Sequence, residues 1–189
     1  EAFKNLDMVN LIYTELLKAG ADRGVALAAL GGGVTGDIAG FAAATFMRGV
    51  PYIQVPTTLL AQVDSSVGGK TGVNHRMGKN LIGAFCQPKL VFVDISTLQT
   101  VKENDFQSGM FEVIKYGLIR DEAFFDYLVG NMERIRNLDE KLLQDTVRRC
   151  CEIKAEVVIA DEREAGLRRI LNIGHTLGHA LEAVIGYGE

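Results

Sequence analysis

The feature that most constrains the fold is a short apolar run that ends in three consecutive glycines. Residues 25–30 are apolar and bounded by glycines, a pattern typical of a buried parallel strand. Gly31, Gly32 and Gly33 lead into residues 38–46, whose small and apolar side chains predict a helix that opens at Thr35 or Asp37. A strand, a glycine turn and a helix in this order indicate an α/β layer of the kind that binds nucleotides.

Two further apolar runs, residues 52–55 and 90–93, continue the predicted parallel sheet, and strand patterns end near Glu103. Beyond that point the apolar spacing predicts helices, at residues 106–119, 122–129, 140–159 and 173–185. The expected fold class is therefore α/β followed by an all-helical part. We place the two domains at residues 1–98 and 99–189. Because no linker rich in proline or serine separates them, we expect them to pack tightly.

The composition is that of an ordinary globular protein, with 48% hydrophobic and 23% charged residues. A net charge of −4 and a pI near 5.5, without a dominant basic run, argue against nucleic-acid or membrane-surface binding. We expect no membrane span and no signal peptide. The three cysteines include no CxxC pair, so neither a disulfide framework nor a cysteine metal site is expected. A reducing cytoplasm is the simplest interpretation.

Both ends of the sequence suggest a fragment of a longer enzyme. The chain opens without Met, inside an amphipathic pattern that predicts a helix ending near Gly20. It stops at Glu189, directly after a predicted helix. We therefore expect partial domains.

The glycine turn is a candidate phosphate site. Glycines between a strand and a helix allow backbone N–H groups to approach a phosphate at the helix N-terminus. The spacing is not GxGxxG, because the next glycine is Gly36, and a simple tight turn is an equally good interpretation. Asp37 is better explained as an N-terminal helix residue than as a ligand contact.

A second candidate phosphate site lies between Asp64 and Asn80. Lys70 and Lys79 each follow a glycine in this segment, and glycine–lysine pairs in loops commonly bind phosphate. The segment is not a P-loop, because GKT is not preceded by the required glycine and strand. The alternative is a solvated loop with surface lysines.

Several charged and polar side chains stand in helical patterns. Glu112 and Lys115, at i and i+3 in an apolar stretch, form either a buried pair or part of a site. Lys154 stands in an apolar stripe of its predicted helix. A lysine in such a position more commonly extends its ammonium to solvent than takes part in a site. Arg168 and Asn172, at i and i+4, would add hydrogen-bond donors for an anionic substrate.

The histidines carry the best clue to chemistry. The chain has three, and two of them, His175 and His179, share a predicted helix face with Glu182 at i, i+4 and i+7. This arrangement suits a metal about as well as a structural role. It is not HExxH, so zinc-protease chemistry has no support. A buried carboxylate such as Glu112 could be a third ligand.

Taken together, these segments resemble one family, the 3-dehydroquinate synthases of the shikimate pathway of aromatic amino-acid and chorismate biosynthesis. The resemblance extends in family order from about residue 29 to the end. The matching segments are GGGVTGDIAGF, RGVPYIQVPTTLLAQVDSSVGGKTGVN, GKNLIGAF, SGMFEVIKYG, DEREAGLRRILNIGHTLGHALE and GYGE.

The resemblance implies a partial Rossmann-like NAD-binding domain and a partial helical domain, with NAD+ and Zn2+ (or Co2+) in the cleft. Glu112 and His175 match two zinc ligands. The family's third ligand is a histidine in an HGEA motif after GYG, where this chain stops. The residues that match the NAD site are Gly33, Val34, Thr35, Gly36, Asp37, Thr57, Thr58, Lys70, Lys79, Thr97, Leu98, Gln99 and Thr100.

The resemblance also implies a substrate site for a carboxylate and a phosphate, which suits a cluster of lysines and arginines in an acidic chain. Arg48 matches an arginine that reaches the neighbouring subunit, which implies a homodimer. Glu164 matches a proton acceptor. The implied catalytic residues are Lys70, Lys115, Lys154, Glu164, Arg168, Asn172 and His179. The implied substrate-binding residues are Arg48, Asp64, Lys70, Asn80, Lys115, Lys154, Arg168, Asn172 and His179.

The implied reaction converts 3-deoxy-D-arabino-heptulosonate 7-phosphate to 3-dehydroquinate and phosphate, a carbon–oxygen lyase reaction that uses NAD+ catalytically. Another sugar-phosphate cyclase, such as 2-deoxy-scyllo-inosose synthase, is the nearest alternative, although GGKTGVN favours dehydroquinate synthase. A related metal-dependent alcohol dehydrogenase would release NADH instead. A third alternative is that residues 1–189 form a non-catalytic module that binds zinc weakly.

Overall fold

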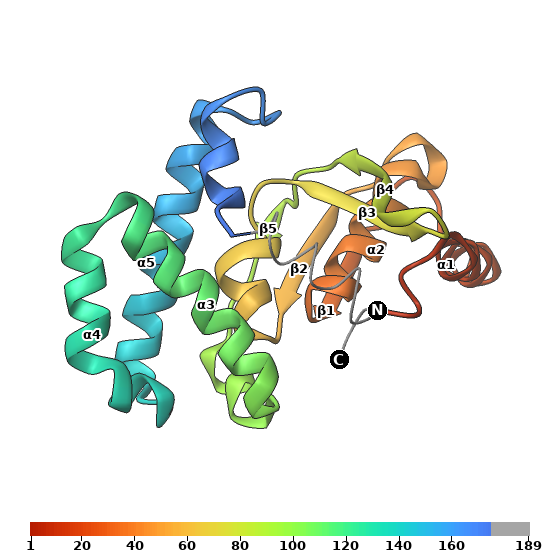
Figure 1. Ribbon diagram of the computed structural model, residues 1–189. Coiled ribbons are helices and arrows are strands. Elements are labelled where there is room, and N and C mark those ends of the chain that lie inside the picture. Colours follow the sequence, from red (N-terminus) through yellow and green to blue (C-terminus); the bar gives the residue numbers. More distant parts are fainter. Residues whose placement is uncertain (175–189) are drawn as a thin grey trace.

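The computed structural model describes residues 1–174, so His175, His179, Glu182 and most of the helix expected at residues 173–185 lie outside the described part. An α/β layer and a group of helices lie side by side (Figure 1). The helices and strands are α1 (Leu6–Lys18), β1 (Leu27–Gly31), α2 (Gly33–Thr45), β2 (Tyr52–Pro56), β3 (Lys70–His75), β4 (Gly78–Phe85), β5 (Leu90–Val91), α3 (Glu103–Arg120), α4 (Glu122–Arg136) and α5 (Glu140–Ala160).

The predicted parallel sheet is present, in the strand order β1-β2-β5. Leu27 pairs with Tyr52, and Ile53 pairs with Leu90, so the chain crosses over by way of α2 between the first two strands. The prediction that residues 25–30 are buried was only partly right, because Ala29 is buried whereas Leu30 is 67% exposed. Because β1 and β2 are parallel, their C-terminal ends lie at the same edge of the sheet.

Helix α2 begins directly after the glycine turn, earlier than expected. The helix begins at Gly33, not at Thr35 or Asp37, because Gly32 takes the extended conformation of an N-cap. It ends at Thr45, one residue before the predicted end. Gly32 has no side chain, so the N-cap residue itself makes no side-chain hydrogen bond to the first-turn N–H groups of α2.

The segment expected as a glycine–lysine loop is a β-hairpin. β3 and β4 pair antiparallel, and Gly72 opposes Gly83. A Cβ atom on Gly72 would lie 2.5 Å from the carbonyl oxygen of Ile82, so the two strands meet at a distance that only glycine permits. A short π-helical segment, Ala61–Ser65, was also not predicted, and it precedes the hairpin. Such segments are frequent at functional sites.

The helical half forms as predicted in α3, α4 and α5, although α4 continues seven residues past its expected end at Val129. Asp121 and Asp139 cap α4 and α5 by accepting hydrogen bonds from Phe124 N and Leu142 N. Near the end of the described part, a 3-10 helix, Leu167–Asn172, follows α5, and Ile173 and Gly174 form a turn rather than the start of a helix.

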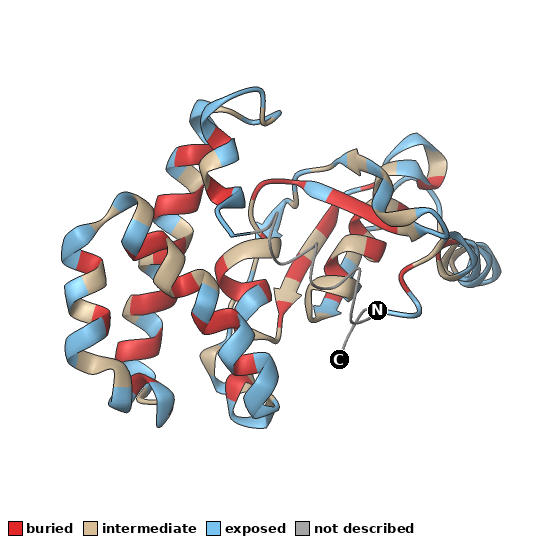
Figure 2. Ribbon diagram, in the orientation of Figure 1, coloured by how far each residue is buried: buried red, intermediate tan, exposed pale blue. Residues whose placement is uncertain are grey.

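One hydrophobic core joins the two halves. Leu59 and Val63, from the segment after β2, and Leu98 pack with Val113 of α3 and Ile153 of α5. Figure 2 shows buried residues along α3 and α5 and in the α/β layer. The tight packing expected from the sequence is therefore present, while the domain boundary at residues 98/99 stays a prediction. In residues 1–174 no helix is long and apolar enough to span a membrane.

Candidate functional site

Most of the residues proposed to bind substrate line one cavity of about 580 Å³. Its walls come from α2, the π-helical segment, the β3–β4 hairpin, α5 and the 3-10 helix that follows. The predicted residues that line it are Asp37, Asp64, Lys70, Asn80, Lys154, Glu164, Arg168 and Asn172. The fold thus brings together side chains from both halves of the chain.

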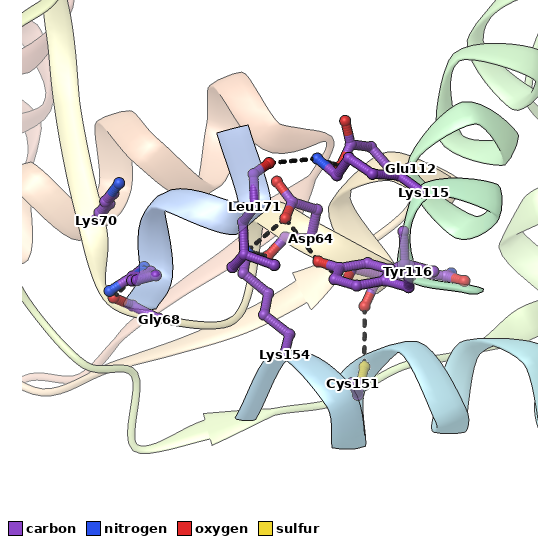
Figure 3. A network of polar contacts seen from close by, with 12 residues as sticks. Asp64, Gly68, Lys70, Glu112, Lys115, Tyr116, Cys151, Lys154 and Leu171 are labelled. Carbon is purple, nitrogen blue, oxygen red and sulfur yellow. Dashed lines mark hydrogen bonds and ion pairs between the residues drawn. The ribbon is translucent and has the colours of Figure 1, made fainter. Parts of the chain in front are cut away.

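Asp64 lies at the centre of a polar network between the two halves (Figure 3). Its Oδ1 accepts hydrogen bonds from Lys154 Nζ at 2.7 Å and from Tyr116 Oη at 2.9 Å. Burial raises the pKa of Asp64, but the Lys154 ammonium and the two hydrogen bonds outweigh burial and leave the pKa below its ordinary value. The carboxylate is therefore charged at neutral pH.

The expectation that Lys154 extends to solvent was wrong. The residue is 5% exposed, and its ammonium also donates to the backbone carbonyl of Asp64. A buried ammonium requires a nearby anion, and the π-helical segment supplies one from a position 90 residues earlier in the chain. Tyr116, which was not among the predicted site residues, completes this network.

Lys70 and Glu164 both line the cavity and form an ion pair with each other. The other carboxylate oxygen of Glu164 accepts a hydrogen bond from Asn172 Nδ2 at 2.6 Å. Burial raises the pKa of Glu164, but hydrogen bonds from Lys70 and Asn172 leave it below its ordinary value. Glu164 therefore contacts two other predicted residues, Lys70 from the hairpin and Asn172 from its own matching segment, which places the hairpin against the segment after α5.

Arg168 is buried and forms part of the cavity wall. Its two terminal nitrogens donate to the carbonyl oxygens of Glu162 at 2.6 Å and Gly68 at 3.1 Å. Asp161 accepts hydrogen bonds from three backbone amides that follow it, including that of Arg168 at 3.0 Å. These amides hold the pKa of Asp161 below its ordinary value. The loop that carries Glu164 is thus fixed at both ends.

Lys4 was not predicted and links the cavity to the start of the chain. Its ammonium is buried and lies 2.6 Å from both Asp37 Oδ2 and Asn80 Oδ1. Burial raises the pKa of Asp37, and the charge of Lys4 only partly offsets this. A lone lysine in an amphipathic stretch gives no sequence signal of such a contact.

The surroundings of Glu112 fit a metal ligand. Glu112 forms an ion pair with Lys115 on α3, and Lys115 Nζ donates to the carbonyl oxygen of Leu171 at 2.7 Å. This contact places α3 against the chain that leads to His175, four residues after Leu171. A carboxylate oxygen is a donor that zinc accepts. No group of three potential ligands converges among the residues that the structure describes, and His175 lies outside them.

The end of the sheet fits a dinucleotide. Gly33 to Asp37 occupy the first turns of α2, and Thr57 and Thr58 directly follow β2. A Cβ atom on Gly32 would approach the Thr58 methyl group at 3.2 Å, and one on Gly33 would lie 2.9 Å from Ser65 Oγ. Backbone amides at a helix N-terminus are groups that can bind a phosphate.

The segment of Thr97, Leu98, Gln99 and Thr100 forms a 3-10 helix, Ile95–Thr100. Gln62 Nε2 donates to Pro56 O and to Thr97 Oγ1, which ties this helix to the end of β2. The side chain of Leu98 is buried in the core, so a contact with a cofactor would involve its backbone. Lys79 lies at the start of β4 and, with Lys4, lines a separate hollow of about 520 Å³.

Arg48 does not line the cavity. It is exposed at the end of the 3-10 helix Phe46–Arg48, with a positive φ of 69°. A larger hollow of about 770 Å³ lies elsewhere, between α3 and α4, and its lining includes Leu98 but none of the other predicted residues. The 580 Å³ cavity is the better candidate, because most of the predicted substrate-binding residues line it, whereas none of them lines the larger hollow within residues 1–174.

Comparisons with known proteins agree with these features. A family model described as 3-dehydroquinate synthase N-terminal matches residues 1–108, and one described as 3-dehydroquinate synthase C-terminal matches residues 109–189. The 3-dehydroquinate synthase of Pelobacter propionicus is 58% identical over 188 residues, which cover 100% of this chain and 52% of that protein. The chain therefore spans about half the length of the curated relatives it matches.

Two solved structures have the same fold with lower identity. A 2-deoxy-scyllo-inosose synthase in complex with carbaglucose-6-phosphate, NAD+ and Co2+ is 34% identical, with a TM-score of 0.89 over 100% of this chain and 51% of its own. A 2-epi-5-epi-valiolone synthase from Streptomyces hygroscopicus, with NAD+ and Zn2+ bound, is 30% identical, with a TM-score of 0.92 over 99% of this chain and 53% of its own. The expected fold class is thereby confirmed.

Proposed function

The chain belongs to the 3-dehydroquinate synthase family, and on that premise we propose that the protein containing it converts 3-deoxy-D-arabino-heptulosonate 7-phosphate to 3-dehydroquinate and phosphate. The single observation that carries the proposal is the cavity in which the matched polar residues meet. Cationic groups from both halves of the chain surround a space large enough for a sugar phosphate.

NAD+ and a divalent metal are proposed as cofactors, supplying reversible oxidation and polarisation of a hydroxyl group when they are bound. The glycine end of α2 would hold the dinucleotide, with Thr57, Thr58 and the 3-10 helix Ile95–Thr100 beside it. Glu112 and His175 would be metal ligands. This assignment is supported by the close backbone at Gly32 and Gly33 and by the contact between Lys115 and the chain before His175.

The remaining residues would bind and orient the substrate. Lys70 and Lys154 both line the cavity, each paired with a carboxylate, and they would donate hydrogen bonds to the carboxylate and phosphate of the ligand. Asp64 would accept a hydrogen bond from a substrate hydroxyl. Glu164 would move a proton or fix Lys70, with which it forms an ion pair. His179 is retained as a substrate ligand by its match to the family.

A homodimer is also proposed, because Arg48 is exposed and outside the cavity of its own chain. It would then contribute to the site of a neighbouring subunit. The cytoplasmic location expected from the cysteine usage stays a proposal.

The test uses the complete protein with NAD+, zinc and the heptulosonate phosphate. Phosphate release without net NADH is the expected result. Accumulation of NADH would favour an alcohol dehydrogenase, and turnover of glucose 6-phosphate in place of the heptulosonate would favour a 2-deoxy-scyllo-inosose synthase. The 58% identity to a 3-dehydroquinate synthase, against 34% to the inosose synthase, favours the first outcome.

A further inference from the structure

We propose that Tyr116 is a positioning residue that orients the Asp64 carboxylate for a hydroxyl group of the ligand, an inference that rests on the function proposed for this cavity. Tyr116 is fully buried on α3 and lines no wall of the cavity itself. It therefore acts through Asp64 rather than on the ligand.

Tyr116 and Lys154 both donate hydrogen bonds to the same oxygen of the Asp64 carboxylate. Tyr116 Oη lies 2.9 Å from Asp64 Oδ1, and Lys154 Nζ lies 2.7 Å from the same atom. Tyr116 Oη is also 3.3 Å from the carbonyl oxygen of Val63, a longer and uncharged alternative for its single proton. Within residues 1–174, each hydrogen bond recorded for this carboxylate ends on Oδ1.

The second oxygen accepts no recorded hydrogen bond from residues 1–174, and we assign it to the ligand. Asp64 lines the cavity, and its side chain remains 31% exposed although both of its partners are buried. A carboxylate oxygen accepts hydrogen bonds only, so the group it selects is a hydroxyl or another donor. A sugar phosphate carries several such hydroxyls, and a site that hydrogen-bonds one of them discriminates against the deoxy analogue.

Tyr116 restricts the carboxylate in a way that Lys154 alone does not. A lysine side chain has four flexible torsions, whereas the tyrosine ring is held by the core of the helical half. The two donors also come from different helices, α3 and α5, and converge on the π-helical segment that carries Asp64 (Figure 3). Loss of the phenolic hydroxyl would leave the ring packing intact and release one of the two restraints.

The test compares Tyr116→Phe with Tyr127→Phe in the complete protein loaded with NAD+ and zinc. Tyr127 is the matched control, because its hydroxyl is buried without a recorded hydrogen-bond partner in the described part of the chain. We expect Tyr116→Phe to lower kcat for phosphate release about tenfold to a hundredfold, as misplaced catalytic groups do. KM should change less than about threefold, because the phosphate contacts are retained. Tyr127→Phe should change neither constant.

A merely structural role would lower the melting temperature and leave kcat per folded molecule unchanged. A kcat within about twofold of the parent value would therefore overturn the proposal. If the parent protein releases no phosphate, the proposed function fails, and a crystal structure of Tyr116→Phe decides the positioning role by itself. A rotated Asp64 carboxylate supports it, and an unchanged carboxylate conformation refutes it.

Discussion

The ammonium of Lys154 lies 2.7 Å from the carboxylate of Asp64, a contact that joins α5 to the π-helical segment before the hairpin. The two residues are 90 positions apart, and both halves of the chain depend on the pair because it sits beside their shared core. Removal of one charge from a buried pair leaves the other without compensation.

Lys154→Met should therefore lower the free energy of unfolding by about 3 kcal/mol. The matched control is Lys141→Met on the same helix, where an exposed ion pair with Asp145 at 3.2 Å is lost. Its effect should stay within about 0.5 kcal/mol. Urea unfolding of the two variants without cofactors measures the difference. Equal effects of the two substitutions would show that the Asp64 pair does not stabilise the fold.

Asp161→Ala should loosen the loop that carries Glu164. Asp161 accepts hydrogen bonds from the amides of Ala165, Gly166 and Arg168, and no other side chain replaces these acceptors in the described residues. Limited proteolysis should cut this loop several times faster in the variant, and the activity should fall because Glu164 no longer holds Lys70. Asp22→Ala, which removes one amide contact far from the cavity, is the control and should change neither.

The Asp161 carboxylate also predicts the direction in which the stability of the fold changes with pH. Hydrogen bonds from the amides of Arg168 and Gly166 hold the pKa of Asp161 below its unfolded value of 3.8. The stabilisation is therefore complete above that value and is lost as the pH falls through the lower, folded pKa. Asp161→Asn should be less stable than the parent at pH 7, and the gap should narrow below about pH 4. A gap that widens in acid would contradict the assignment.

The sequence predicted those helices and strands in which the apolar residues follow a single clear pattern. The parallel strands and the helices α3 to α5 were visible in this way, but the β3–β4 hairpin was not. Thr71, Gly72 and Val73 are all buried, because α2 covers one face and the cavity lies at the other, so the alternation of a half-exposed strand is missing. The start of α2 was misplaced because glycines serve as both turn and cap.

The site was predicted residue by residue from the resemblance, but its contacts were not. The sequence places Lys154 in an apolar stripe and gives no sign that Asp64, in a π-helical turn, supplies its partner. Tyr116 was missed because a tyrosine in an apolar helix gives no sign of a distant hydrogen-bond partner. Lys4 was missed because a single lysine before α1 gives no sign of its partners either. Partners distant in the chain depend on tertiary packing, which local patterns do not encode.

Replacement of two glycines in neighbouring helices by alanine should change the stability of the protein in opposite directions. A Cβ atom on Gly109 of α3 would lie 2.7 Å from the backbone nitrogen of Leu60 and from the Cβ of Leu59, so the helix would have to move away from the segment that carries Asp64. Gly130 lies inside α4 with no atom within 4 Å of the added group. Gly130→Ala should therefore stabilise the protein by about 0.5–1 kcal/mol through helix propensity alone. Gly109→Ala should destabilise it by about 1–3 kcal/mol through overpacking.

Activity separates the two variants further. Displacement of α3 would move Glu112, Lys115 and Tyr116 together relative to Asp64, so Gly109→Ala should lose activity per folded molecule, whereas Gly130→Ala should keep it. Thermal unfolding and phosphate release on the same preparations measure both effects. If Gly109→Ala were as stable and as active as the parent, the close contact between α3 and Leu59–Leu60 could not be what sets the spacing of the site.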